Sequence, residues 1–266
     1  MDGISPILQS GIRSIVATIV LGIWMLSRRI RLFENDGCWF PGIIAGLLFA
    51  IEFVLIYWSL EYTAVSRAII FVFMAPFVVA FGIHWFIPSE ELKRIQVAGM
   101  CLAFSGIIFA FAEGFTVLTG KEWIGDLMCI GAALVWGATT VLIRATKLSS
   151  IAPSRTLFYQ LIVSAVLLPS VSLLMGESGI TELTPIVLAC LAYQGLIVAF
   201  ASYLTWFWLI AHYPAARLSA YTFFTPLFGV IFGIILLSEP FTWSILIVRI
   251  LVTAGIYLVN LKPAER

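Results

Sequence analysis

Three ionisable side chains lie deep inside long apolar stretches of this sequence: Arg13, Glu52 and Arg249. Counted along their expected helices from the same end, they stand at depths of roughly 10, 13 and 12 Å. A charge inside a bilayer is costly, so such residues mark solute pathways and proton relays or pair with one another. Glu52 can pair with either arginine. Two interpretations stay open: an ion pair that only fixes helix register, and a solute or proton site at Glu52.

In the second half of the sequence, a tyrosine occupies the position that corresponds to Glu52. When Tyr62 is aligned with Tyr213, Glu52 corresponds to Tyr203. An aromatic cavity with few hydrogen-bonding groups suits a small amphipathic organic solute better than a bare ion. Aromatic residues make up 14% of the chain, however, and the alternative is that many of them face lipid or neighbouring helices. The residues of similar depth that we predict to line a solute pathway are Arg13, Glu52, Trp136, Tyr159, Gln160, Tyr203 and Trp206, with Gln194 close to them.

Two arginines each precede a proline by nine residues: Arg67 precedes Pro76, and Arg217 precedes Pro226. The arginines are candidates for the two mouths of a pathway, where a cation attracts an anionic or zwitterionic solute. We favour the alternative that they extend to the membrane interface. Each proline removes a backbone hydrogen bond within an apolar stretch, which predicts a kink that acts either as a hinge or as a static feature.

The composition shows what kind of elements position these residues. Apolar residues make up 62% of the 266, charged residues only 11%, and the mean hydropathy is +1.08. A soluble domain is about one quarter charged. Apolar runs of about twenty residues, the length that crosses a bilayer as a helix, alternate with short polar breaks. We predict nine membrane-spanning helices, over residues 6–27, 41–60, 64–86, 95–113, 123–143, 154–175, 185–210, 214–237 and 241–260. Gly42-x-x-x-Gly46 and Gly229-x-x-x-Gly233 predict close helix contacts.

The sequence is duplicated. Four residues of the first half, Arg67, Pro76, Glu90 and Gly106, recur in order as Arg217, Pro226, Glu239 and Gly255. We predict one repeat over residues 1–115, with four helices, and a second over 122–262, with five. Aligning Pro6 with Pro153 places the counterpart of span 123–143 before residue 1, so one helix of ten is expected to be missing. Repeats with an odd number of helices insert in opposite orientations, and we therefore predict an all-α membrane bundle of two inverted five-helix repeats.

Basic residues gather at one set of span ends, which are expected to be cytoplasmic. These residues are Arg28, Arg29, Arg31, Lys93, Arg94, Arg144, Lys147, Arg155, Lys262 and Arg266. This distribution places the C-terminus in the cytoplasm.

The matched motifs resemble those of the drug/metabolite transporter superfamily, EamA type. The resemblance covers nearly the whole chain. It rests on residues 133–138 (Ala-Leu-Val-Trp-Gly-Ala), on Pro6 with Arg13, on the two Arg-to-Pro segments, and on Ser89-Glu90 and Ser238-Glu239. It implies a carrier of small metabolites in a prokaryotic inner membrane, often an exporter, with its pathway between the repeats. The absent first helix departs from the family pattern.

Several other chemistries are not expected. The four cysteines and two histidines lack metal or redox spacing, and no phosphate-binding loop of the Gly-x-x-x-x-Gly-Lys type is present. We predict no metal, no cofactor and no enzymatic activity. A net charge of +1 spread along the loops does not provide a nucleic-acid surface.

The function that we predict is secondary active transport of small organic metabolites, such as amino acids, by alternating access. We expect an exporter, with a proton as a candidate coupling ion. The alternative from a different class is a membrane protein that does not transport, either an enzyme acting on a lipid-linked substrate or a partner subunit. Substrate-dependent flux across liposomes distinguishes the two.

Overall fold

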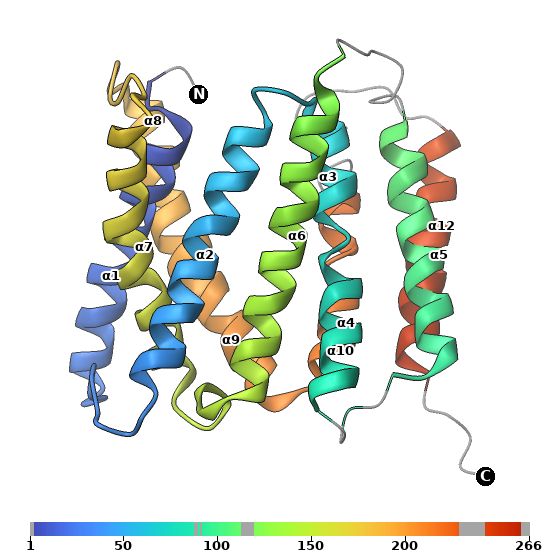
Figure 1. The fold of residues 1–266 in the computed structure, drawn as a ribbon, viewed down its shortest axis with the longest axis horizontal. Coiled ribbons are helices and arrows are strands. Elements are labelled where there is room, and N and C mark those ends of the chain that lie inside the picture. The colour runs from blue at the N-terminus through green and yellow to red at the C-terminus, as the bar shows by residue number, and fades with distance from the viewer. Residues whose placement is uncertain (1–2, 88–89, 91, 113–119, 229–242, 262–266) are drawn as a thin grey trace. The chain divides into compact units, whose positions relative to one another are not determined.

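The computed structural model describes residues 3–87, 90, 92–112, 120–228 and 243–261, without the side chains of 243–246, and the described part is built from α-helices. Seven of its helical segments are long and apolar enough to cross a membrane. They are α1 (Pro6–Ser27), α2 (Trp39–Ser59), α3 (Val65–Val72) with α4 (Ala75–Phe86), α5 (Arg94–Phe111), α6 (Glu122–Ala145), α7 (Pro153–Leu174), and α8 (Pro185–Ala192) continued by the π-helix η4 (Tyr193–Ser202) and α9 (Tyr203–His212) (Figure 1). The chain is therefore a polytopic membrane helix bundle, as predicted.

The last two predicted spans are described only in part. Helix α10 (Ala215–Tyr221) begins the span expected over 214–237, and α12 (Trp243–Asn260) forms most of the span expected over 241–260. Gly229, Gly233 and Glu239 lie outside the described residues.

Prolines set where several helices begin. Pro6, Pro153 and Pro185 occupy the first helical position of α1, α7 and α8, where a missing N–H leaves no hydrogen bond unmade. Pro76 lies in the first turn of α4, directly after α3 has ended at Val72. The two predicted kinks are therefore interruptions of the helix. Pro226 occupies a similar place, because α10 ends at Tyr221 and helical backbone resumes at residue 224.

The helices form two compact units. Unit 1 comprises Met1–Tyr57 and Leu142–His212, and unit 2 comprises Trp58–Val141 and Tyr213–Arg266. Each unit takes segments from both halves of the sequence, so its boundaries differ from those of the predicted repeats 1–115 and 122–262. Those repeats stay a prediction.

Unit 1 is assembled around α7. Helix α1 packs along it, with Gly11 so close that an added Cβ would lie 2.7 Å from the Pro169 ring (Figure 1). Helix α2 crosses α7 through the predicted glycine pair, because a Cβ on Gly42 or Gly46 would lie 2.6 Å from Tyr159 or Val163. The prediction of close packing at these two glycines is confirmed.

Unit 2 is built on an equally close pair, α5 with α12 (Figure 1). A Cβ on Gly255 would stand 2.5 Å from both the carbonyl oxygen of Gly99 and the amide nitrogen of Ala103. Phe223 is fully buried, and its ring lies 6.2 Å from that of Phe77 and 6.4 Å from that of Phe104. The small residues bring the backbones together, and the aromatic rings fill the space beside them.

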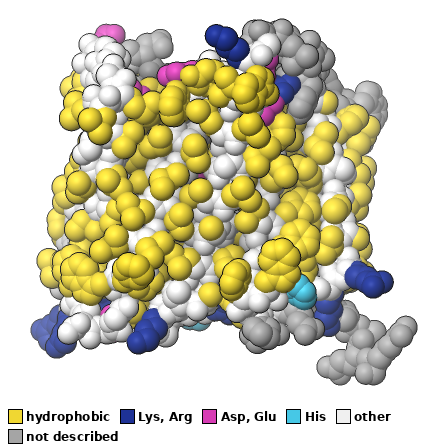
Figure 2. All heavy atoms as spheres, viewed as in Figure 1, with side chains coloured by type: hydrophobic (Ala, Val, Ile, Leu, Met, Phe, Trp, Pro, Cys, Tyr) yellow, Lys and Arg dark blue, Asp and Glu magenta, His cyan; other side chains and the backbone are white. Residues whose placement is uncertain are grey.

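Large apolar side chains cover much of the helix surface that Figure 2 shows, while charged side chains gather near helix ends. Leu173, Leu174, Ile186, Trp85 and Phe40 are each between 74% and 87% exposed. Contiguous apolar surface of this kind is typical of contact with lipid.

Candidate solute site

A buried cation with unused donors lies in unit 1. Arg13, on α1, is 6% exposed, and its guanidinium carbon stands 4.2 Å from the centre of the Phe53 ring on α2. Its Nε and Nη2 atoms are buried, and neither donates a hydrogen bond within the described part of the chain. A cation over an aromatic face is attracted to the ring, but the ring accepts none of the directional bonds that a guanidinium offers. Buried polar atoms are nearly always satisfied in native proteins, which makes these two donors candidates for binding a solute.

Glu52 lies beside this cation without bonding to it. The carboxyl belongs to α2, is 8% exposed, and is within electrostatic range of Arg13. Among the described residues no oxygen of Glu52 comes within 4.0 Å of an arginine nitrogen. The interpretation of Arg13 and Glu52 as a closed ion pair therefore does not hold. Arg249 lies on α12 of unit 2 and is exposed.

Aromatic rings surround the two charges. Phe49, Phe53 and Tyr57 follow one another at four-residue spacing on α2, with ring centres 4.9 and 6.1 Å apart. Tyr203 of α9 meets Phe49 edge to face at 5.8 Å and lies within electrostatic range of Glu52. The structure thus brings Arg13, Glu52 and Tyr203 together, as expected. The sequence analysis missed the three aromatic residues on α2, although their spacing was a usable signal.

A π-helix directly precedes Tyr203. Segment η4 packs against α1, where a Cβ on Gly195 would lie 2.7 Å from Val16 and 3.7 Å from the carbonyl oxygen of Arg13. A π-helix has wider turns than an α-helix and occurs frequently at functional sites. Here it ends at Ser202, immediately before Tyr203.

The other predicted pathway residues are distributed differently. Tyr159 and Gln160 are buried where α7 crosses α2, and the Gln160 amide donates to the carbonyl oxygen of Ala45 at 3.4 Å. Trp206 is half-buried on α9. Trp136 lies on α6 in unit 2, with its ring 6.4 Å from that of Phe73.

Arg67 has a different environment from Arg13. It is 6% exposed on α3 of unit 2, and it pairs through two nitrogens with Asp126 of α6, the Nε to Oδ1 distance being 3.2 Å. Thr63 also donates to Asp126, at 2.9 Å. The expectation that Arg67 extends to the membrane interface is wrong, because a buried carboxylate holds it inside. Arg217 is half-buried on α10.

Asp126 was missed by the sequence analysis, and packing explains how it reaches its partners. Gly125 lies so close to the end of α2 that a Cβ there would be 2.8 Å from the carbonyl oxygen of Ser59. The missing side chain lets α6 approach the segment that carries Thr63 and Arg67.

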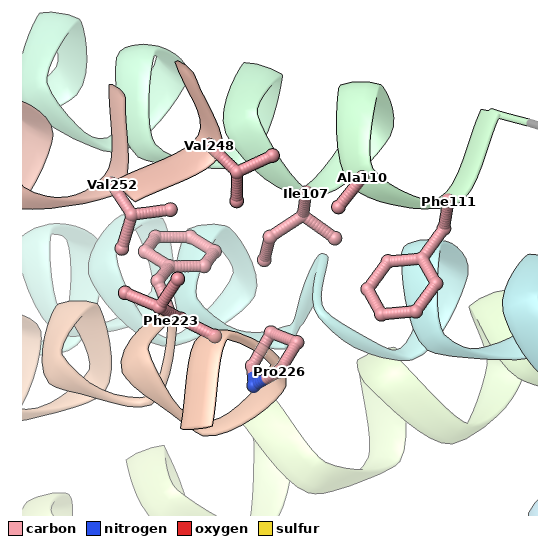
Figure 3. A pocket seen from close by; sticks show the side chains of 8 residues that line it. Ile107, Ala110, Phe111, Phe223, Pro226, Val248 and Val252 are labelled. Atoms are coloured by element: carbon pink, nitrogen blue, oxygen red, sulfur yellow. The ribbon is translucent and has the colours of Figure 1, made fainter. Parts of the chain in front are cut away.

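Unit 2 also has an apolar crevice, lined by residues that include Ile107, Phe111, Phe223, Pro226 and Val252 (Figure 3). The side chains that line it carry no polar group, and it has no room for a water molecule. This crevice is a packing defect beside Pro226 rather than a solute site.

Comparison with known proteins gives consistent results. The family model described as the EamA-like transporter family matches residues 1–112 and 123–261. An uncharacterized transporter of Bacillus subtilis, YvbV, is 28% identical over 261 residues, which cover 97% of this chain and 83% of the relative. A probable amino-acid metabolite efflux pump of Salmonella typhimurium is 25% identical over 185 residues, covering 65% of this chain and 60% of the pump. A crystal structure of another protein has the same fold, with a TM-score of 0.83 at 17% identity, and the match covers 96% of this chain and 89% of the other.

Proposed function

Because the chain belongs to the EamA-like transporter family, we propose that it is a secondary active transporter that exports small organic metabolites, such as amino acids and related amphipathic solutes. One observation carries the choice of solute: Arg13 is buried with two donors that have no acceptor among the described residues. A guanidinium presents its donors as a planar fork that matches a carboxylate. A solute carboxylate is therefore the ligand that fits Arg13.

The neighbours of Arg13 fit the rest of such a solute. Glu52 offers a carboxyl group that either pairs with a solute ammonium or carries a proton. Phe49, Phe53 and Tyr203 supply an apolar wall with one hydroxyl. Opposite charges beside an aromatic surface suit a zwitterion with an apolar side chain better than a sugar or a metal ion. The printed name of the Salmonella relative, a probable amino-acid metabolite efflux pump, supports the same solute class and an outward direction.

Movement is proposed to occur by alternating access between the inverted repeats 1–115 and 122–262. The helix interruptions next to Pro76 and Pro226 are the proposed hinges, because a short break absorbs backbone rotation more easily than a continuous helix. Arg217 remains a candidate for one mouth of the pathway, and Arg67, the other candidate, is tied to Asp126. We propose an inner-membrane location with the C-terminus in the cytoplasm, and the basic residues at one set of span ends support this orientation.

The driving force is proposed to be a proton or solute gradient. The sequence contains no motif for nucleotide binding. Glu52 is buried and ionisable, and we therefore propose it as the proton carrier. If protons are coupled through Glu52, a side chain that does not ionise at this position is expected to uncouple solute flux from the pH gradient.

The test is flux in proteoliposomes that contain the purified chain. Labelled amino acids, amines and nucleosides are offered with and without an imposed pH gradient. Glu52→Gln, which keeps the shape of the side chain and removes its charge, is expected to abolish flux or its dependence on the gradient. Glu61→Gln removes an exposed carboxyl instead and is the matched control. Unchanged flux and pH dependence in Glu52→Gln would exclude a role for Glu52, and absence of flux for every solute offered would favour the alternative of a membrane protein that does not transport.

A further inference from the structure

The two ends of unit 1 are held by different kinds of bonds. At one end, the segment that follows α7 is joined to residues 3–5 through the backbone: Ser5 donates to Gly179 at 2.9 Å, and Thr181 donates to Gly3 at 3.0 Å. The carboxylate of Glu177 also accepts from the amides of Ile7 and Leu8, at 3.2 and 3.1 Å, and so caps α1. Backbone bonds and a bidentate cap make this end a permanent junction.

The other end is held mainly through side chains. Residues 28–38, which we call the strap, join α1 to α2, and among the described residues the backbone of 31–37 makes no hydrogen bond to the backbone of α7. Instead, Arg155 in the first turn of α7 pairs through Nη1 with Glu34 and through Nη2 with Asp36, the latter at 2.6 Å. The side chain of Arg155 is 8% exposed, whereas those of Glu34 and Asp36 are 38% and 28% exposed. Ion pairs to partly solvated carboxylates are weak and reversible.

Aromatic contacts continue this attachment into α2. Phe33 of the strap stacks on Trp39, the first residue of α2, at 5.0 Å, and on Tyr159 of α7 at 6.1 Å. Phe33 and Trp39 are nevertheless 42% and 46% exposed. The strap is therefore attached through half-exposed groups over the point where α2 meets α7.

The attached state leaves one polar group unsatisfied. The Nε atom of Arg155 is buried and donates to no described residue. An unmade buried hydrogen bond is costly, so the attached arrangement of the strap carries this cost.

The position of the strap connects it to the candidate solute site. It joins the two helices that hold Arg13 and Glu52, and α2 packs closely on α7 at Gly42 and Gly46. Small movements of packed helices past one another are a known form of conformational change. We propose that the strap is a releasable latch: detachment from Arg155 frees α2 to move against α7 during the transport cycle, which makes Arg155 a positioning residue for the site. This inference rests on the proposed transport function.

The reactivity of Cys38, at the end of the strap, can show whether the strap is attached to Arg155. It is 1% exposed, and its amide donates to Asp36 at 3.0 Å. That hydrogen bond is the main reason why the pKa of Asp36 is lowered, which keeps the carboxyl charged toward Arg155. Burial is the main reason why the pKa of the Cys38 thiol is raised, so the thiol is expected to react slowly while the strap is attached.

The experiment measures alkylation of Cys38 by N-ethylmaleimide in the full chain in proteoliposomes, read by mass spectrometry of its peptide. Arg155→Gln is expected to raise the labelling rate about fivefold or more and to lower solute flux. Arg31→Gln is the matched control, because Arg31 is the exposed partner of Glu34, at 3.7 Å, and its loss leaves Arg155 attached. A labelling rate in Arg155→Gln equal to that of the parent protein would overturn the proposal.

Two further measurements keep the result decisive. If Arg155→Gln does not fold, Glu34→Gln removes one of the two ion pairs without changing α7 and leaves Asp36 beside Cys38, and it is also expected to raise labelling. In the parent protein, a solute that is transported is expected to change the labelling rate, and no change during active transport would overturn release within the cycle. Absence of flux in the parent would overturn the proposed function instead, while the labelling of the variants would still test the latch.

Discussion

Arg13 in unit 1 and Arg67 in unit 2 are both 6% exposed, yet their surroundings differ. Arg67 has a carboxylate, Asp126, which accepts bonds from two of its nitrogens and a third from Thr63. Arg13 has an aromatic ring at 4.2 Å and a nearby carboxyl to which it makes no bond. Burial alone therefore does not separate the two sites. The partner does: a carboxylate in direct contact neutralises the charge of Arg67, whereas Arg13 lies over a ring, which neutralises no charge.

The largest expected effect follows removal of Asp126. Asp126→Ala leaves the Arg67 charge buried without its partner, and this is expected to cost about 3–5 kcal/mol of folding free energy. The readout is thermal unfolding and monodispersity in detergent. Replacing both residues with leucine removes the charge as well as the partner, so much of the lost stability should return. A stable Asp126→Ala variant would contradict the structural role of this pair.

The second prediction concerns Arg13, whose replacement is expected to affect transport rather than stability. Arg13→Gln is expected to reduce solute flux at least about tenfold, because a charge-assisted bond to the solute is lost, while thermal stability changes little. Arg13→Lys keeps the charge but loses the planar fork, so it should not restore full flux. If Arg13→Gln unfolds the protein as severely as Asp126→Ala does, the contrast between the two sites disappears.

The smallest effect is expected at Thr63. Thr63→Val preserves shape and removes one donor to Asp126, which should cost about 1 kcal/mol and leave the Arg67 pair in place. Unfolding in detergent measures the change, and flux per folded molecule should equal that of the parent. A large loss of flux at unchanged stability would place Thr63 in the transport machinery rather than in a structural pair.

The membrane-spanning segments could be predicted closely from the sequence. The segment predicted at 6–27 is α1 over Pro6–Ser27, and the one predicted at 185–210 is helical over Pro185–His212. Predictions of this kind succeed because a helix must be long and apolar enough to cross the bilayer, and length and composition are local properties. The kink predicted at Pro76 is a break between α3 and α4. The π-helix before Tyr203 was not predicted, because hydropathy does not report how a helix is wound.

The candidate site could be predicted only in part. The similar depths of Arg13 and Glu52 along their helices predicted that the two side chains lie near each other, and the structure agrees. The alignment of the two halves predicted that Tyr203 lies near them as well. The same reasoning gave Arg67 an interfacial position and did not identify Asp126, which lies 59 residues away in the chain. Tyr159 and Gln160 have suitable depth, but they pack where α2 crosses α7, because depth does not define the direction in which a side chain points.

The sequence by itself determined that this chain is a helical membrane protein, since the length and composition of its apolar runs are local properties. Only the tertiary structure decided which buried charges are paired. Arg67 meets Asp126, Arg155 meets Glu34 and Asp36 from 121 and 119 residues away, and Arg13 meets a ring. These partners come from different helices and loops, and glycine contacts such as those of Gly125 and Gly42 set how closely the helices approach. Helix packing, which hydropathy does not encode, therefore places Arg13 over a ring and Arg67 against a carboxylate.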